Sequence, residues 1–311
     1  MASLYDMMLR HSLYLEGAKK GTADEFSSSV VSDLDAVVKR AFQNINVDNF
    51  GEFTKADFNR FVADIRLRTN NVHNQNTKEL MNDTKKLSRV ETTLFQGMFR
   101  EDTGDRLATP SNVWGSVKNS NIPATGQTFQ KSANTFRNSS VGNIERLLRN
   151  GYADKLDTTD VFKSIRGVKS LGYKDGVFGK ISGWGRTLAN TLMSHTSSSV
   201  KDKIAPSYYD EYQWVSVLDD VTTEICWERD GEIYKMGEGP QPPAHYNCRS
   251  TTVPISPSRE DTEEPDTLAE WLDGQPSEVL KDIFGDVDPS LDNVKVISLD
   301  GLRDKLDIIL I

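Results

Sequence analysis

Two cysteines and one histidine have the residue types and the spacing of metal ligands in this chain of 311 residues. Cys226 precedes the segment His245-x-x-Cys248, and the chain contains no third cysteine. Thiolate sulfur and imidazole nitrogen are ligands that Zn²⁺ prefers in proteins. The sequence therefore predicts a candidate zinc site whose ligands are Cys226, His245 and Cys248.

A structural zinc site has four protein ligands, so one ligand is missing from this set. Asp219 and His195 are the nearest candidates by residue type. A water molecule in the fourth position would instead leave the site open for catalysis. A further interpretation needs no metal: Cys226 and Cys248 are small buried apolar residues, and His245 is a hydrogen-bonded loop residue.

Two further groups could take part in chemistry beside these ligands. His195 could act as a general base that Asp219 orients, although structural hydrogen bonds are the simpler role for both. Arg249 could bind a phosphate or a carboxylate, but we favour an ion pair with Asp219 or Asp230 that holds the loop. The chain contains no Walker loop, dinucleotide-binding glycine motif or serine-hydrolase motif, so the sequence predicts no enzyme.

Helices are expected to position much of this chemistry, because apolar residues recur at helical spacing through the first hundred residues. The first helix is expected to end at Gly17, and a second follows Asp24. Thr54 is a candidate N-cap for a third helix, and a fourth covers residues 80–98. We therefore predict a helical arm or bundle over residues 1–110.

The stretch 111–140 is rich in Ser, Thr, Asn and Gly and is predicted to be a linker. Helical patterns return at residues 141–150, 158–165 and 184–204. After the arm and the linker, residues 141–311 are predicted to form a C-terminal domain that contains these helices and an acidic C-terminal segment.

A small sheet is expected beside the cysteine-histidine loop. Alternation over residues 211–218 predicts a strand, and Asp230-Gly231 predicts a hairpin turn. Further strands are expected at residues 251–255 and 294–297, with a helix over residues 267–284 that Pro276 interrupts. The predicted fold class is α+β: an N-terminal helical region followed by a C-terminal domain with a small sheet and a cysteine-histidine loop.

The segment from Trp214 to Arg249 resembles the head morphogenesis domain of the Mu F-like minor head proteins of tailed bacteriophages. The resemblance rests on the following residues: Trp214, Asp219, Thr222, Cys226, Asp230, Gly231, Pro242, Pro243, His245, Asn247, Cys248 and Arg249. It extends over residues 140–290 through the helix that carries Arg186, Asn190 and His195 and through the Trp271-Leu272 and Gln275-Pro276 pairs. One departure affects the metal, because Thr223 stands where many members of the family have a cysteine.

The resemblance implies a structural protein of the virion, made in the host cytoplasm and placed at the portal vertex or the inner capsid wall. Its implied partners are the portal protein, the major capsid protein or both, and it could leave the head with the DNA. Two other functions stay open: a metal-dependent hydrolase or nuclease carried in the virion, and an internal DNA-binding protein. Zinc-dependent turnover would favour the first, and strongly salt-dependent DNA binding would favour the second.

Charge and hydropathy narrow these alternatives. The net charge is −9, and residues 260–311 alone contain 15 acidic and 4 basic residues. This segment would repel a phosphate backbone, so extensive contact with DNA is expected elsewhere if it occurs at all. No apolar run approaches the roughly 20 residues of a membrane span, so no span is predicted.

Overall fold

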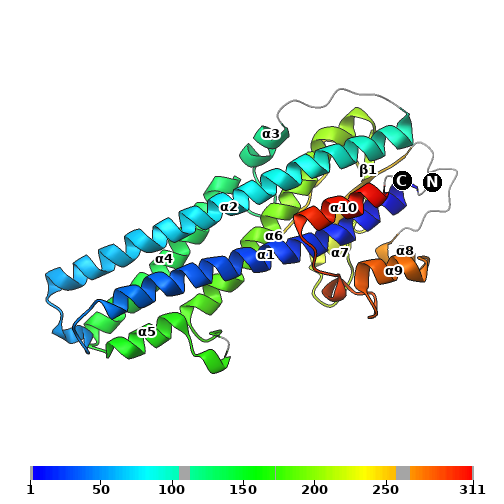
Figure 1. Cartoon of the computed structure of the whole chain (residues 1–311). Coiled ribbons are helices and arrows are strands. Elements are labelled where there is room, and N and C mark those ends of the chain that lie inside the picture. The colour runs from blue at the N-terminus through cyan, green and yellow to red at the C-terminus, as the bar shows by residue number, and fades with distance from the viewer. Residues whose placement is uncertain (1–2, 105–112, 172, 257–266, 310–311) are drawn as a thin grey trace. The chain divides into compact units, whose positions relative to one another are not determined.

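The computed structural model describes residues 3–104, 113–171, 173–256 and 267–309 (Figure 1). Helices dominate these residues: α1 (Leu4–Gln43), α2 (Lys55–Thr103), α3 (Val113–Asn119), α4 (Phe129–Ala153), α5 (Thr158–Arg166), α6 (Val177–Ile204), α7 (Glu224–Arg229), α8 (Leu268–Asp273), α9 (Ser277–Phe284) and α10 (Leu299–Ile309). The strands are β1 (Glu211–Val215), β2 (Ile233–Lys235) and β3 (Thr251–Pro254). The predicted α+β class is confirmed. Within the described residues, no helix combines the length and the apolar character needed to cross a lipid bilayer.

The described residues form two compact units that are not contiguous in sequence. The sheet unit comprises segments from residues 1–22, 82–129 and 190–311, and the helical unit comprises residues 23–81 and 130–189. The predicted boundaries, 1–110, 111–140 and 141–311, do not coincide with these units, because α1, α2 and α6 each contribute residues to both. Residues 105–112 and 257–266 lie outside the described residues. The predicted boundary between residues 110 and 111 falls in the first of these gaps, and the start of the acidic segment, residues 260–266, falls in the second.

Gly17 does not end a helix, because α1 continues without interruption from Leu4 to Gln43. The Gly17 carbonyl accepts a hydrogen bond from the Ile297 amide at 3.3 Å. A Cβ atom at position 17 would overlap the backbone carbonyl oxygen of Lys295. The glycine therefore permits a close crossing of two chain segments, and the prediction of a helix end was wrong.

The strand predicted over residues 294–297 was also wrong. The amide of Lys295 donates to the carbonyl of Ile283 at 3.0 Å, while Ile297 donates to Gly17. These two bonds go to helices and not to a neighbouring strand. The segment is therefore an extended crossing over α1 and α9.

The helix α2 begins where the sequence predicted a cap and runs further than expected. The Oγ1 atom of Thr54 accepts a hydrogen bond from the Asp57 amide at 3.2 Å, which satisfies one free amide of the first turn. The third and fourth predicted helices form this single element. In the stretch predicted as a linker, α3 buries Val113 and Val117, and α4 begins at Phe129, twelve residues before the predicted start at 141. A polar composition concealed these buried positions.

The sheet has the order β2-β1-β3, and both pairs are antiparallel. Gln213 on the central strand lies opposite Ile233 on one side and Val253 on the other. The strands predicted at 211–218 and 251–255 are confirmed. Asp230-Gly231 does not form the predicted hairpin, because α7 lies between β1 and β2. Gly231 adopts a φ of 80°, a conformation suited to glycine, at the turn from α7 into β2.

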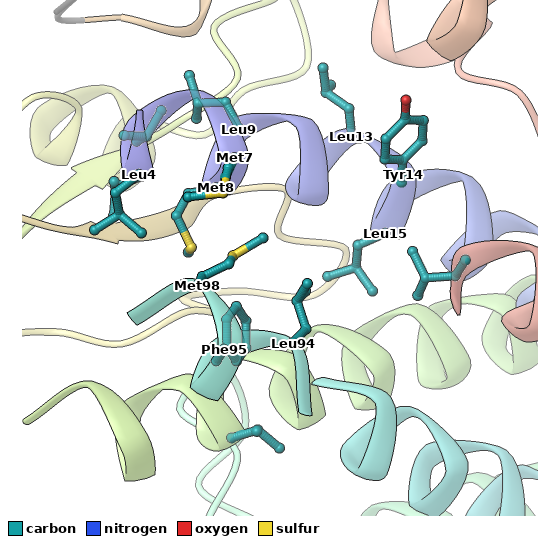
Figure 2. Packing of buried hydrophobic residues seen from close by; sticks show 14 of the residues in the cluster. Leu4, Met7, Met8, Leu9, Leu13, Tyr14, Leu15, Leu94, Phe95 and Met98 are labelled. Atoms are coloured by element: carbon teal, nitrogen blue, oxygen red, sulfur yellow. The ribbon is translucent and has the colours of Figure 1, made fainter. Parts of the chain in front are cut away.

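The core of the sheet unit lies between the first half of α1 and the last half of α2. In Figure 2, Met8 and Leu15 on α1 point toward Leu94, Phe95 and Met98 on α2, and all five side chains belong to one buried cluster. The same cluster includes side chains from β1, β3, α8 and α9. Segments from both ends of the chain therefore share one apolar core.

Replacing Gly17 with alanine should destabilise the protein despite alanine's higher helix propensity. The added Cβ would collide with the Lys295 backbone, so we expect the free energy of unfolding to fall by about 2 kcal/mol. The matched control is Gly142→Ala in α4, where a Cβ would have no neighbour within 4 Å. That change should raise stability by up to about 1 kcal/mol. Urea denaturation measures the free energy of unfolding of both variants. Equal changes in the two variants would contradict the close approach of the Lys295 backbone to Gly17.

Candidate metal centre

The three predicted ligands come from two short elements of the sheet unit. Cys226 lies in the first turn of α7, which Thr223 precedes as N-cap residue. His245 and Cys248 lie on the loop between β2 and β3, just after the buried Pro243. Both cysteines are buried, whereas His245 is half-buried. The sheet and α7 therefore bring together residues that are about twenty positions apart in sequence.

The three side chains converge on one point. The Sγ atom of Cys226 lies 3.1 Å from Nε2 of His245 and 3.9 Å from Sγ of Cys248. All three ligand atoms lie within 4.8 Å of one another. Two sulfurs bound to one tetrahedral zinc ion would be about 3.8 Å apart, whereas a disulfide would bring them to about 2.05 Å. The geometry therefore fits a group that could hold a metal ion, and both cysteines are free thiols.

Hydrogen bonds in this group favour the charged form of Cys248. A hydrogen bond from the Cys226 thiol, assisted by one from His245, lowers the pKa of Cys248 despite its burial. The same hydrogen bond, together with burial, raises the pKa of Cys226. The interaction with Cys248 also raises the pKa of His245. These shifts favour the thiolate form of Cys248, and the thiolate is the form that binds metals.

Hydrogen bonds behind the ligands fix their orientation. The Nδ1 atom of His245 lies 2.8 Å from the Tyr246 carbonyl, so Nδ1 carries a proton and Nε2 is the ring nitrogen that faces the cysteines. The carbonyl of Cys248 accepts from Lys19 Nζ at 3.3 Å and from Ser194 Oγ at 3.4 Å. Lys19 lies on α1 and Ser194 on α6. The loop is therefore held against two helices of its own unit.

We call the segment from β1 to β3, residues 211–254, the cysteine-histidine module. Trp214 and Asp230 have structural roles in this module. The fully buried Trp214 packs against Cys226 and Cys248. Its indole Nε1 donates to Ser216 at 2.8 Å, and its backbone carbonyl accepts from the Gly231 amide at 2.9 Å. Asp230 accepts from the Ser216 amide at 2.6 Å. These contacts join β1 to the turn after α7.

Ser216 is a residue of this module that sequence reasoning missed. Its hydroxyl donates to the Cys226 carbonyl at 2.8 Å and lies 3.0 Å from the hydroxyl of Ser250. The signal was the alternation over residues 211–218, which places Ser216 on the same face of the strand segment as the fully buried Trp214. A serine on a buried face requires partners, and here the partners are the ligand-bearing segments.

The predicted ion pair between Arg249 and Asp219 is confirmed. Two guanidinium nitrogens of Arg249 lie 2.6 and 2.5 Å from the two carboxylate oxygens of Asp219. The Asp219 carboxylate also accepts from the Val221 amide and from the hydroxyl of Thr222. These interactions, the Arg249 hydrogen bond first, lower the pKa of Asp219 to about 2.

Neither residue expected as a fourth ligand belongs to the metal-binding group among the described residues. The oxygens of Asp219 are occupied by Arg249 and its own turn. The ring of His195 is buried, with Nε2 3.1 Å from Ser120 Oγ and Nδ1 3.2 Å from Ser199 Oγ. Burial lowers the pKa of His195 to about 4, so the ring is neutral at pH 7. Hydrogen bonding within the fold therefore accounts for both residues.

An open pocket of about 420 Å³ adjoins the ligands. Its lining includes Cys226 and His245 together with Thr223, Arg249 and Asp292. A ligand could thus reach the cysteine-histidine group from solvent.

The chain is similar to a distant relative among known proteins. An uncharacterized protein of Haemophilus influenzae is 26% identical over 180 residues, a match that covers 50% of this chain. The match spans only 39% of that relative. No protein-family model and no solved structure matches the chain.

Replacing Asp219 with asparagine should weaken the module in a pH-dependent way. The folded state holds the pKa of Asp219 below its ordinary 3.8, so the ion pair stabilises the protein fully above that pH. Its contribution should disappear as the pH falls toward about 2. We expect a loss of about 1 kcal/mol at pH 7, discounted because the Asp219 side chain is 37% exposed.

Urea denaturation of wild type and Asp219→Asn at pH 7 and pH 3 measures this effect. The control is Asp286→Asn, which breaks an ion pair with Lys281. The Asp286 side chain is 81% exposed, so this change should alter the free energy of unfolding little. A stability difference between wild type and Asp219→Asn that stays constant down to pH 3 would show that the ion pair does not hold the loop.

Proposed function

We propose that this protein is a minor head protein of a tailed double-stranded DNA bacteriophage, acting in head assembly at the portal or the inner capsid wall. The observation that carries the proposal is that the residues of the resemblance contact one another around the cysteine-histidine loop. Trp214 packs on the cysteines, Asp230 holds the strand segment and Arg249 pairs with Asp219. Residues scattered over 36 positions thus serve one small module, which supports the resemblance to the Mu F-like proteins.

In this role the chain is made in the host cytoplasm and becomes part of the phage head. Its partners are the portal protein, the major capsid protein or both. The module is tied to long helices through Lys19 and Ser194, so a contact made by those helices would be transmitted to a firmly placed loop. Such a design suits assembly, in which geometry between subunits matters more than turnover.

The proposal extends to zinc as the metal held by Cys226, His245 and Cys248. The two-thiol, one-imidazole donor set and the sulfur separation suit that ion. Bound zinc would supply a cross-link between α7 and the loop. Thr223 is a poor ligand, so the fourth position falls to a solvent molecule or a group from outside the module.

The pocket beside the ligands favours a second candidate, a metal-dependent hydrolase or nuclease. The expected base for that reaction is Asp219 or His195, and burial lowers the pKa of His195 to about 4. A general base works best when its pKa lies near the operating pH, and the pKa of Asp219 is about 2. Turnover of DNA or peptidoglycan by zinc-loaded protein would establish this candidate, and no turnover would remove it.

Metal content tests the zinc assignment. We expect about one zinc per chain in purified wild-type protein. Cys248→Ser should lose the metal, because a neutral hydroxyl replaces the thiolate. Thr223→Cys should bind zinc at least about tenfold more tightly, because a fourth thiolate completes the tetrahedral site.

Elemental mass spectrometry and competition with a zinc chelator provide the two measurements. Ser199→Ala, a change outside the ligand set, is the control and should bind metal as wild type does. Wild-type protein without metal even after incubation with zinc would reject the zinc assignment and leave the structural module intact.

The virion role is tested in the phage that encodes the protein. Density-purified, DNA-filled heads should contain the chain in far fewer copies than the major capsid protein. Deleting the gene should abolish filled heads, and supplying the wild-type gene in trans should restore them. Absence of the protein from every head intermediate, with an unchanged yield of infectious particles, would refute the proposal.

A further inference from the structure

A second pocket lies in the helical unit, between α2 and α4. Its volume is about 280 Å³. The lining residues are Asn74, Thr77, Lys78, Met81, Gln130, Ala133, Asn134 and Arg137. The pocket therefore combines two cations, three carboxamides and a hydroxyl, and no carboxylate lines it.

Arg137 donates its side-chain hydrogen bonds to neutral groups. Its Nη1 donates to the Asn74 side chain at 3.0 Å and its Nε donates to the Asn138 side chain at 3.3 Å. Both partners are neutral amides. By contrast, Arg66 forms an ion pair with Glu145, and Arg166 with Asp35. The positive charge of Arg137 thus lacks a carboxylate partner among the described residues.

Lys78 is exposed and likewise forms no ion pair within the described part of the chain. It lies one turn after Asn74 on α2, which places both on the side of the helix that faces the pocket. Two unneutralised cations beside one concave surface create a local positive potential.

The charge distribution of the chain favours the same ligand class. The segments of the helical unit contain 18 basic and 14 acidic residues, whereas those of the sheet unit contain 19 basic and 32 acidic residues. An anion is therefore repelled by the net charge of one unit and attracted by that of the other.

We propose that the α2–α4 pocket binds a phosphate group, with Arg137 and Lys78 as its cationic contacts. The guanidinium fork matches two phosphate oxygens, and the ammonium group supplies a second charge. The amide groups of Asn134 and Gln130 and the Thr77 hydroxyl can donate further hydrogen bonds. This site is separate from the cysteine-histidine group and requires no metal.

Two probes identify the source of the phosphate. Inorganic phosphate tests a free anion, and a fluorescent DNA duplex of about 20 base pairs tests a nucleic-acid backbone at about 50 mM salt. Full-length protein is titrated with each, by calorimetry and by fluorescence anisotropy. We expect Lys78→Ala/Arg137→Gln to weaken binding of the responding probe at least about tenfold.

Lys78→Ala alone should weaken binding as well, and because Lys78 is exposed it keeps the test valid if the Arg137 change disturbs folding. The matched control is Lys39→Ala/Arg149→Ala, which removes two exposed cations of the same unit away from the pocket. Its affinity should stay within about twofold of wild type.

Binding of inorganic phosphate alone would assign a free anion, and binding of the duplex in competition with phosphate would assign a nucleic-acid backbone. Absence of binding by both probes would overturn the proposal. So would equal losses in the pocket variant and its control, since they would indicate a diffuse electrostatic effect. Neither result would alter the metal content or the incorporation into heads, so the proposed function is judged separately.

Discussion

The carboxylate of Glu91 is fully buried and joins three separate segments of the sheet unit. It accepts from His11 Nε2 on α1 at 2.9 Å and from Ser197 Oγ on α6 at 3.1 Å. A buried carboxylate costs several kcal/mol unless such partners are present, so α1 and α6 must keep their register against α2. Lys19 lies two turns after His11, and Ser194 one turn before Ser197. The same register therefore delivers both donors to the carbonyl of Cys248.

This dependence explains why a loop without regular structure can hold reactive side chains in place. The module has few elements of its own, and much of its position comes from the helices behind it. Trp214 fills the space between sheet and cysteines, while Ser216 and Asp230 satisfy the backbone where the strand gives way to α7. A local substitution in the loop should thus matter less than loss of the helix register, except at the ligands themselves.

Local chemistry in the sequence predicted several features well. Thr54 before a helical pattern, the alternation around Trp214 and the pairing of Arg249 with Asp219 each depend on neighbours or on strong charge complementarity. The convergence of Cys226, His245 and Cys248 followed from residue type and spacing. These signals need no knowledge of the distant chain.

Features set by distant segments could not be predicted. Gly17 normally signals a helix end, yet here it makes room for Lys295, almost 280 residues later. The apolar residues around 294–297 suggested a strand, although their backbone bonds to helices. His195 and Asp219 have the chemistry of ligands, but tertiary hydrogen bonds already occupy them. The composition of residues 111–140 likewise hid the buried positions of α3 and α4.

The order of the segments also has a consequence for biosynthesis. The helical unit consists of residues 23–81 and 130–189, so the ribosome has released every part of it before the cysteine-histidine loop is made. The sheet unit needs residues 190–311 to cover the apolar faces of α1 and α2. During translation those apolar faces stay uncovered until the last third of the chain has been made. A nascent protein of this design depends on prompt completion, or on a chaperone, to keep its exposed apolar helices from aggregating.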